Sequence, residues 1–467
     1  MKSSWREGDK EKSVTAPLSL IISAFSRTPD ARLQITPLLS NNLNSELFLV
    51  DLGLGKNRMG GSSLAQVFNQ IGNETPDLDD PALFAKFFSV INTLNKEGLV
   101  NAFHDRSDGG ALITLLEMAF ASRCGLDIRT SKLLYELFNE ELGCVIQVSN
   151  HNREKVLNEL EKAGLKEHTK SIAKINETDE IIIYQDDIEV FKDQRVNLQK
   201  VWSSTSYHIS KLRDNPESAL SEYSELSESS NGLKISPTFD INENISTPYL
   251  NQGIKPKIAI LREQGINGHI EMAAAFTKAG FEATDVHMSQ ILSGEVSLSR
   301  FKGLAACGGF SYGDVLGAGR GWANSILLNH KAKDEFSEYF LRSDSFTLGV
   351  CNGCQMISNL REIIPGTEDW PSFERNTSEQ FEARFTGVRI NNSKSLFFAG
   401  MQDSVMPIAI AHGEGKASFK SKLPENTISM QYVDHSGNAS QIYPHKKRRK
   451  PERVALGSPR AHNRKQG

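Results

Sequence analysis

Two regions of the chain alternate short apolar runs with amphipathic segments, and a polar stretch separates them. In the first region, continuous apolar runs predict strands over residues 14–24, 47–52 and 100–103. Apolar positions three and four residues apart predict helices over residues 62–71, 83–94 and 111–122. This alternation extends to about residue 184 and indicates an α/β or α+β domain.

The second region begins at residue 256 and repeats strand and helix signals at shorter, more regular intervals. Its predicted strands occupy residues 257–261, 281–287, 304–306 and 346–350. A helix is expected over residues 269–279 and another from near Gln355. Such spacing favours a doubly wound parallel sheet, in which ligands bind beyond the carboxyl ends of the strands.

The remaining segments differ in composition from both regions. Residues 203–254 are rich in Ser, Glu, Asn and Pro, which indicates a linker with some surface-bound structure. Residues 446–450 form a basic run, Lys-Lys-Arg-Arg-Lys. Such a run can bind nucleic acid or direct targeting, but the interpretation that we favour is a disordered or aberrant terminus. We therefore expect five parts, namely residues 1–44, 45–202, 203–254, 255–444 and 445–467.

Composition narrows the function classes. The 467 residues are 39% hydrophobic and 24% charged, with a net charge of −4, so nucleic acid and membrane are not expected partners. No run of about 18 apolar residues is present, and the polar start does not resemble a signal peptide. Five cysteines in a chain this long indicate free thiols in a reducing compartment, so we expect a cytoplasmic location.

The most informative motif is Gly-Val-Cys-Asn-Gly-Cys-Gln, residues 349–355, at a predicted strand-to-helix junction. A sharp turn there would hold the Cys351 thiol clear of the backbone, and the helix N-terminus would favour its thiolate. The Asn352 amide could then stabilise an oxyanion. The pair Cys351 and Cys354 could instead be half a zinc site or a redox pair.

A second glycine-rich loop, residues 308–314, follows another predicted strand. Its backbone N–H groups could point into the same crevice as Cys351, because both loops lie at carboxyl strand ends. Together the two loops suit acyl transfer through a thioester.

Several longer motifs resemble phosphoribosylformylglycinamidine synthase, in its long single-chain form with a class I glutamine amidotransferase domain. In the second region these motifs are residues 261–265, 307–319, 349–359, 373–376 and 411–415. In the first region they are residues 15–20, 104–110 and 138–143. The resemblance covers about residues 13–444. It implies an aminoimidazole-ribotide-synthetase-like C-terminal half of mixed α/β and α+β class, followed by a doubly wound, flavodoxin-like glutaminase domain.

The resemblance also implies an activity in purine biosynthesis. The family converts formylglycinamide ribonucleotide, glutamine and ATP to the amidine, with ADP, phosphate and glutamate as products. Cys351 would form a glutamyl thioester and release ammonia to the synthase site. The amides of Gly309 and Asn352 would be the oxyanion donors. Gln355, His412 and Gly413 would help to hold glutamine.

In the synthetase-like half, the resemblance makes Asp105 a Mg²⁺ ligand and Ser107 a nucleotide contact. A carboxylate and a hydroxyl before Gly109 and Gly110 could hold Mg²⁺ and phosphate at a helix N-terminus. Residues 105–108 could equally form an N-cap with a local salt bridge.

Two departures from the family lower the expected activity. The first half of the synthase domain does not precede residue 13, and a separate chain is one possible source of it. The family's terminal Pro-His-Pro-Glu motif is altered: Glu452 fits its glutamate, but Lys450 stands in place of the general-base histidine. Lysine is a poor base at neutral pH, and His445 is a possible substitute. We expect impaired glutaminase activity and no complete synthase reaction from this chain alone. The alternative is a catalytically defective fragment that acts only as a glutamine- or nucleotide-binding or interaction module.

Overall fold

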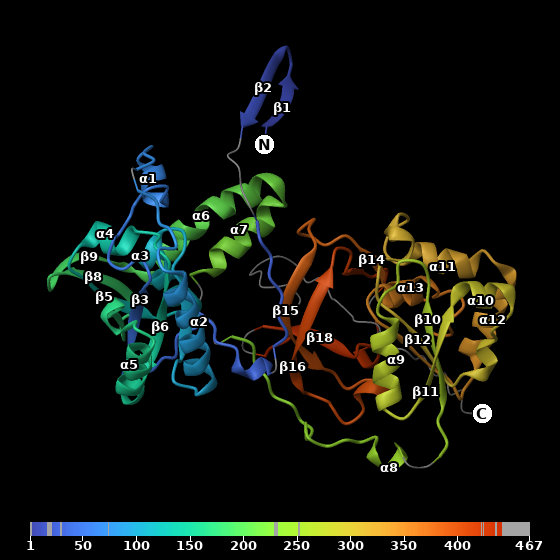
Figure 1. The fold of residues 1–467 in the computed structure, drawn as a ribbon. Coiled ribbons are helices and arrows are strands. Elements are labelled where there is room, and N and C mark those ends of the chain that lie inside the picture. Colours follow the sequence, from blue (N-terminus) through green and yellow to red (C-terminus); the bar gives the residue numbers. More distant parts are fainter. Residues whose placement is uncertain are drawn as a thin grey trace. The chain divides into compact units, whose positions relative to one another are not determined.

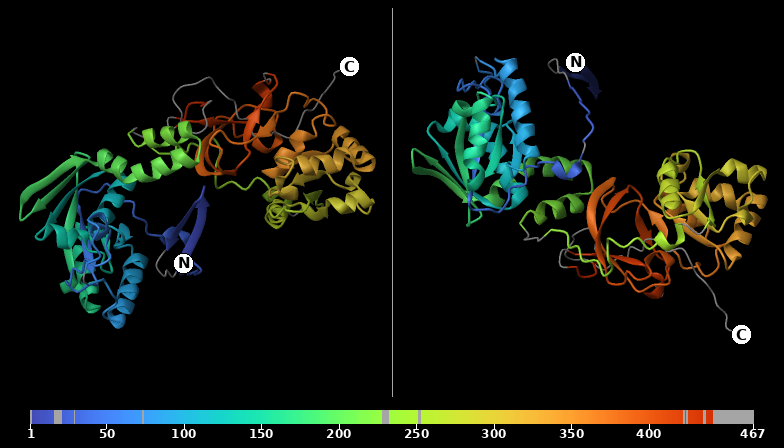
Figure 2. Two further views of the ribbon diagram at one scale, coloured as in Figure 1. Left: turned by 90° about the horizontal axis from the view of Figure 1, so that it is seen from above. Right: turned by 60° about the horizontal axis from the view of Figure 1, so that its bottom comes forward.

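The computed structural model describes residues 2–15, 21–28, 30–72, 74–227, 232–250, 253–421, 423, 425–434 and 437–440. By its internal contacts the chain divides into two units, Met1–Gln199 and Lys200–Gly467. Figures 1 and 2 show their elements. In the described part of the chain, no helix combines the length and the apolar character that a membrane crossing requires.

The first unit is built around a seven-stranded sheet of order β4-β6-β3-β7-β5-β8-β9, in which only the β5–β8 pair is parallel. Its strands are β3 Ser45–Asp51, β4 Ala102–Asp105, β5 Gly125–Thr130, β6 Gly143–Ser149, β7 Thr169–Asn176, β8 Glu180–Gln185 and β9 Ile188–Gln194. Its helices are α1 Ser63–Val67, α2 Pro81–Lys96, α3 Gly110–Ser122, α4 Leu133–Phe138 and α5 Arg153–Lys162.

Both faces of this sheet are covered, and the sequence of β3 shows why. Successive side chains of a strand point to opposite faces. Leu47 and Leu49 pack in a core with α3 and α4, whereas Phe48 and Val50 pack in a second core with α2 and α5. A strand buried on both faces reads as a continuous apolar run, which is the pattern of residues 47–50.

The second unit contains a four-stranded parallel sheet of order β11-β10-β12-β13. The strands are β10 Lys257–Arg262, β11 Glu282–His287, β12 Gly303–Ala306 and β13 Phe346–Gly349. Helices α9 His269–Lys278, α10 Met288–Ser293, α11 Arg320–Leu327, α12 His330–Leu341 and α13 Asn352–Asn359 surround it (Figure 1). Residues 258–261 are all fully buried, as a parallel sheet covered on both faces requires. The predicted doubly wound sheet is therefore confirmed.

Smaller antiparallel sheets complete the second unit. One pairs β14 Ser372–Glu374 with β17 Lys416–Ser418, and the other has the order β16-β15-β18. Its strands are β15 Glu382–Ile390, β16 Val405–His412 and β18 Met430–Val433. Strand β17, which pairs with β14, directly follows the loop of residues 411–415. Gln355 on α13 donates a hydrogen bond to the Glu414 carbonyl, and this bond holds the loop close to the helix.

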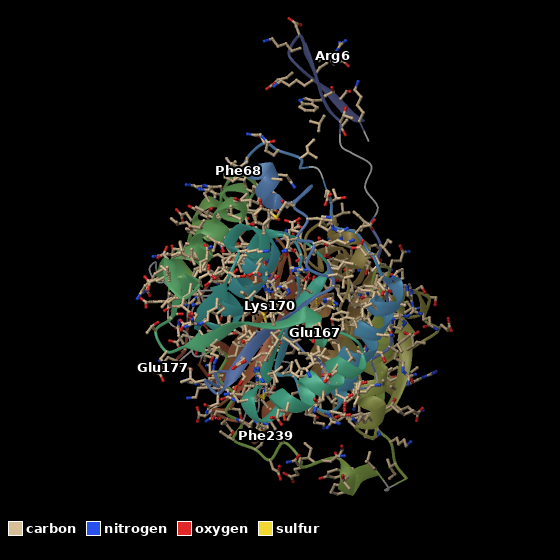
Figure 3. The ribbon with its side chains drawn as sticks, turned by 60° about the vertical axis from the view of Figure 1, so that its left-hand side comes forward. Arg6, Phe68, Glu167, Lys170, Glu177 and Phe239 are labelled. Atoms are coloured by element: carbon tan, nitrogen blue, oxygen red, sulfur yellow. The ribbon has the colours of Figure 1, made fainter. Side chains whose placement is uncertain are left out.

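Two expectations about elements need correction. The strand expected over residues 14–24 is not seen as one element: β2 Lys10–Thr15, which pairs with β1 Lys2–Glu7, covers only its beginning. Residues 16–20 lie outside the described residues, and residues 21–24 are exposed without regular structure. The helix expected over residues 62–71 ends at Val67, because the apolar side chains beyond it find no core. Phe68 is 67% exposed, and Figure 3 marks it at the end of α1.

The stretch expected to be a linker is partly helical. Helix α6 runs Arg195–Arg213 and α7 runs Pro216–Glu225, and α8 is a short turn at Thr247–Leu250. Asn215 caps α7 and proline occupies its first turn, both favourable there. Tyr207 and Tyr223 stack with ring centroids 4.4 Å apart and join α6 to α7. Serine-rich composition therefore concealed a helical pair that contributes little buried surface.

Candidate active site

Cys351 lies at the junction of β13 and α13 in a strained backbone conformation. Its φ is 54° and its ψ is −120°, outside the regions that a side-chain-bearing residue ordinarily adopts. Such strain costs of order 1–3 kcal/mol and persists where the surrounding fold imposes it. Cys351 is also exposed and is the N-cap of α13. The sharp turn predicted from the sequence is present, and α13 begins at Asn352 rather than near Gln355.

Close backbone approach explains the glycines of this turn. A Cβ on Gly353 would overlap the carbonyl oxygen of Ala306 at the end of β12. A Cβ on Gly349 would come within 2.8 Å of the Cys354 Cα. A Cβ on Gly308 would lie 3.0 Å from the Cys351 Cβ, so the second glycine-rich loop runs directly beside the cysteine. The two loops expected to share a crevice are adjacent.

Two amide groups near Cys351 remain available to bind an oxyanion. Within the described residues, neither the Gly309 N–H nor the Asn352 N–H donates a hydrogen bond. Gly309 has a φ of 150° and forms an isolated antiparallel β-bridge with Ile266. The hydrogen bond beside this bridge is donated by the Phe310 N–H to the Gly265 carbonyl, and not by the Gly309 N–H. Unpaired N–H groups beside a nucleophile are what oxyanion stabilisation needs.

Gln355, which is expected to help to hold glutamine, is bonded within the site. Its Nε2 donates to the Glu414 carbonyl at 2.7 Å, and its Oε1 accepts from Asn352 Nδ2 at 3.2 Å. The side chain is 8% exposed. Gln355 therefore ties α13 to the 411–415 loop in this structure, because both ends of its amide are already bonded.

His412 and Gly413 belong to a loop that Asn376 organises. Asn376 Nδ2 donates to the His412 carbonyl at 2.7 Å, and its N–H donates to the Gly413 carbonyl at 2.9 Å. The His412 Nδ1 lies 3.0 Å from Asn376 Oδ1, which also accepts from the Gly415 N–H. Burial lowers the pKa of His412, so the ring is held in its neutral form.

The alternatives for the cysteine pair do not fit this arrangement. Cys354 packs against an apolar cluster that includes Phe373 and Ala417, whereas Cys351 is exposed. None of the five cysteines forms a disulfide bond. The described residues hold no group of three or more His, Cys, Asp or Glu side chains that could bind a metal. Burial raises the pKa of Cys307 to about 12, so that thiol is a poor nucleophile.

Two residues of this site were inside motifs recognised in the sequence but received no role. Asp314 accepts a hydrogen bond from Asn352 Nδ2 at 2.8 Å, and Asn376 organises the His412 loop. Spacing alone could not identify them, because their partners lie 36 to 38 positions away in the chain. Glu452, Lys450 and His445 lie outside the described residues, so their roles remain predictions.

In the first unit, Asp105 and Ser107 are both exposed at the end of β4. The proposed N-cap is wrong, because Gly109 caps α3 without a side-chain bond. The Gly109 N–H donates to Glu140 Oε1 at 2.8 Å, so a carboxylate of the protein occupies the position suggested for phosphate. Asp105, the expected Mg²⁺ ligand, lies 3.3 Å from His104 Nδ1, and within the described residues it belongs to no group of three or more His, Cys, Asp or Glu side chains that could bind a metal.

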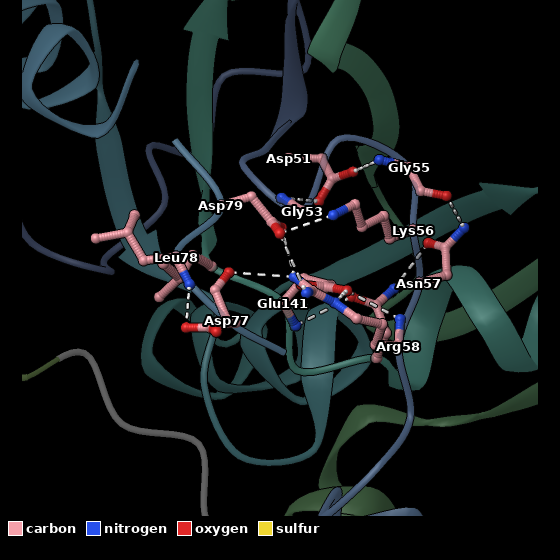
Figure 4. Close-up of polar contacts among 12 residues, drawn as sticks. Asp51, Gly53, Gly55, Lys56, Asn57, Arg58, Asp77, Leu78, Asp79 and Glu141 are labelled. Carbon is pink, nitrogen blue, oxygen red and sulfur yellow. Dashed lines mark hydrogen bonds and ion pairs between the residues drawn. The ribbon is translucent and has the colours of Figure 1, made fainter. Parts of the chain in front are cut away.

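The local salt bridge suggested for residues 105–108 is also wrong. Arg106 is buried and donates from Nη2 to Asp51 Oδ1 at 2.5 Å, on the neighbouring loop. Figure 4 shows that loop and its second brace, in which Arg58 bonds the fully buried Glu141 and also Asp79. These contacts fix the glycine-rich turn that follows β3.

Comparisons with known proteins agree with the two-unit organisation. Residues 50–185 match the AIR synthase related protein, C-terminal domain. Residues 255–453 match the CobB/CobQ-like glutamine amidotransferase domain. Each match falls within one of the two units.

Solved structures with similar folds include three informative examples. PurLQS from Thermotoga maritima is 21% identical, with 44% of this chain and 88% of that chain covered and a TM-score of 0.33. T. maritima PurL complexed with FGAR is 14% identical, with 36% and 30% covered and a TM-score of 0.28. E. coli HypE, a hydrogenase maturation protein, is 18% identical, with 34% and 52% covered and a TM-score of 0.26.

This chain therefore spans less than a third of the PurL chains to which it is similar. The domain order is nevertheless the one that the sequence motifs indicated. Residues 50–185 and 255–453 therefore belong to the AIR synthase-related and glutamine amidotransferase domain families, joined in the order that the resemblance to phosphoribosylformylglycinamidine synthase implies.

Proposed function

We propose that this chain releases ammonia from glutamine at Cys351 for a phosphoribosylformylglycinamidine synthase reaction of purine biosynthesis. It would supply the glutaminase and half of the synthase domain. The observation that carries the proposal is the strained elbow at Cys351, with two unpaired amides beside it. The glutamine amidotransferase match over residues 255–453 supports the same assignment.

The proposed reaction begins when the Cys351 thiolate attacks the side-chain carbonyl carbon of glutamine. The carbonyl oxygen becomes an oxyanion, which the N–H groups of Gly309 and Asn352 would stabilise. The carbon–nitrogen bond then breaks, the nitrogen leaves as ammonia after taking up a proton, and a glutamyl thioester remains. Water hydrolyses the thioester to glutamate and restores the thiol. His412 and Gly413 would border the bound glutamine, and Glu452 is proposed to assist proton transfer.

The ligase step is proposed to use ATP to activate the amide oxygen of formylglycinamide ribonucleotide. Relatives solved as PurL complexed with ATP and with FGAR support these substrates. Ser107 is proposed as a nucleotide contact because it is exposed beside the α3 N-terminus. The described residues around Asp105 do not form a Mg²⁺ site, so no step is assigned to a metal there. We propose a cytoplasmic location and a separate chain that completes the synthase domain.

The test is covalent trapping with a glutamine-mimicking diazo-ketone, read by intact mass. One label on the wild-type chain, absent from Cys351→Ala and retained in Cys307→Ala, is expected. Cys307 is a matched control because it also follows a strand of the same sheet but is buried. Competition by glutamine, and not by glutamate at the same concentration, would show that the pocket recognises the amide. A folded wild-type chain that takes no label would favour the alternative of a binding or interaction module.

A further inference from the structure

The side chain of Asn352 is held on every side although its backbone N–H is unpaired. Asn352 is 1% exposed. Its Oδ1 accepts from the Ser311 hydroxyl at 2.6 Å and the Ser311 N–H at 3.3 Å. Its Nδ2 donates to Asp314 Oδ1 at 2.8 Å and Gln355 Oε1 at 3.2 Å. The amide therefore has one orientation that satisfies all four contacts, with its NH₂ toward the acceptor-only carboxylate.

The loop that carries Asp314 is itself strained. Tyr312, Gly313 and Asp314 have φ values of 52°, 63° and 51°, in the left-handed region. This conformation is strained for Tyr312 and Asp314, which carry side chains. The loop is held by bonds from the Tyr312 N–H to the Gln264 carbonyl and from the Gly319 N–H to Asp314 Oδ1. Strain that persists in a loop next to the nucleophile indicates that the fold holds the Asp314 carboxylate in one position for the function of the site.

The hydrogen bonds continue beyond the elbow. Asn352 bonds Gln355, and Gln355 bonds the Glu414 carbonyl in the 411–415 loop. Asp314, Asn352 and Gln355 thus connect three loops at one end of the parallel sheet. The proposed reaction forms or breaks no covalent bond in these three side chains.

We propose that Asp314 is a positioning residue, which acts through the Asn352 side chain to direct the Asn352 backbone N–H at the oxyanion. This inference rests on the proposed function and adds a residue to it. The bond is charge-assisted, and such bonds are about twice as strong as neutral ones. The bonded side chain anchors the Asn352 Cα, so loss of the Asp314 bond would let the strained backbone between Cys351 and Asn352 shift, and with it the N–H that the oxyanion needs. The described hydrogen bonds of the Asp314 carboxylate go to Asn352 and Gly319 and not to Cys351.

Three full-length variants test this proposal. Asp314→Ala removes the acceptor, and Asp314→Asn keeps an oxygen that can accept from Asn352 Nδ2. Asp344→Ala is the matched control: Asp344 pairs with Arg342 and Lys302 at an exposed site of the same unit. All three are checked for folding by thermal unfolding and then labelled at Cys351 with the diazo-ketone over a range of concentrations.

The labelling separates positioning from binding. We expect Asp314→Ala to lower the maximal labelling rate by about 10-fold, because small displacements of a catalytic donor cost this much or more. The half-saturating concentration should change less than about 2-fold, because the carboxylate does not bind glutamine. Asp314→Asn should recover most of the rate, and Asp344→Ala should match the wild type. A loss confined to the half-saturating concentration, or equal losses in both Asp314 variants, would overturn the proposal.

Hydrogen–deuterium exchange gives a readout that does not depend on the glutaminase reaction. Peptides that cover residues 350–359 should exchange faster in Asp314→Ala than in the wild type and in Asp344→Ala. Unchanged exchange would show that Asp314 does not hold the elbow. If the folded wild-type chain takes no label, the proposed function fails, and the exchange comparison still decides the role of Asp314.

Discussion

At the scale of single residues, the site depends on positions where no side chain fits. Gly308, Gly349 and Gly353 each leave room for a neighbouring backbone or for Cys351. The functional groups are the thiol and two amides, and the glycines let the loops that carry them approach one another. Substitution at these positions therefore affects packing and the site together.

Gly353→Ala is expected to lower the free energy of unfolding of the second unit by about 1–3 kcal/mol, because its Cβ would overlap the Ala306 carbonyl. Gly413→Ala is the matched control, since a Cβ there meets no atom within 4 Å. Its effect should stay within about 0.5 kcal/mol. Urea unfolding followed by circular dichroism measures both. Equal stabilities for the two variants would contradict the packing argument.

His412 gives a prediction about pH. Burial lowers its pKa from 6.5, so the folded protein favours the neutral ring while the unfolded chain still takes up a proton near pH 6.5. Between 6.5 and the lowered value the unfolded state binds more protons, so stability falls as the pH falls through this window.

His412→Gln should therefore lose less stability than the wild type when urea unfolding is compared at pH 7.5 and pH 5.5. His330→Gln, which changes an exposed histidine on α12, should show the same pH dependence as the wild type. A His412 variant with an unaltered pH dependence would show that burial of this ring does not contribute.

At the scale of elements, buried charge fixes the loops of the first unit. Glu140 accepts hydrogen bonds from the N–H groups of Ser63 and Gly109, at the beginnings of α1 and α3. The adjacent Glu141 is fully buried and bonds the Arg58 backbone and guanidinium. Two consecutive carboxylates after α4 thereby hold two segments that are distant in sequence, residues 58–63 and the beginning of α3.

Glu141→Gln is expected to destabilise the first unit by about 2 kcal/mol, because Arg58 loses its charge-assisted bonds to a fully buried carboxylate and keeps only its ion pair with Asp79. Arg58 is only 9% exposed at its side chain, so water cannot readily replace the carboxylate. Glu159→Gln, in the exposed pair with Lys162, should change stability by less than about 0.5 kcal/mol. Denaturant unfolding measures the free energy of unfolding of both variants. A similar small loss of stability in each would show that the buried Glu141 carboxylate does not stabilise the first unit.

At the scale of the whole molecule, the two units have separate hydrophobic cores. The two cores of the first unit lie on the faces of the seven-stranded sheet, and the main core of the second lies around the parallel sheet. These three cores share no residue. Separate cores allow separate unfolding, since cooperativity depends on shared packing.

We therefore expect two transitions in calorimetry of the intact chain. Glu141→Gln should lower the midpoint of one transition, and Gly353→Ala should lower the midpoint of the other. A single transition that both substitutions shift equally would show that the units unfold together.

The sequence predicted the elements with strong local patterns. Residues 83–94 and 111–122 lie within α2 and α3, and the parallel strands match their predicted runs within one or two residues. Helical periodicity and buried strand runs are local properties, so no tertiary contact is needed to detect them. The resemblance likewise identified Cys351 and the glycine loops, because their motifs are contiguous.

Only the tertiary structure decided how side chains from distant loops are used. The sequence could not predict the hydrogen bond from Gln355 to the Glu414 carbonyl, because that carbonyl is 59 positions away. The same holds for Arg106, which bonds Asp51, 55 positions earlier, and for Glu140 at the α3 N-terminus. The partner of a side-chain hydrogen bond depends on which segments lie next to each other in the folded protein. A strand or a helix, in contrast, is indicated by the pattern of apolar and polar residues that are neighbours in the sequence.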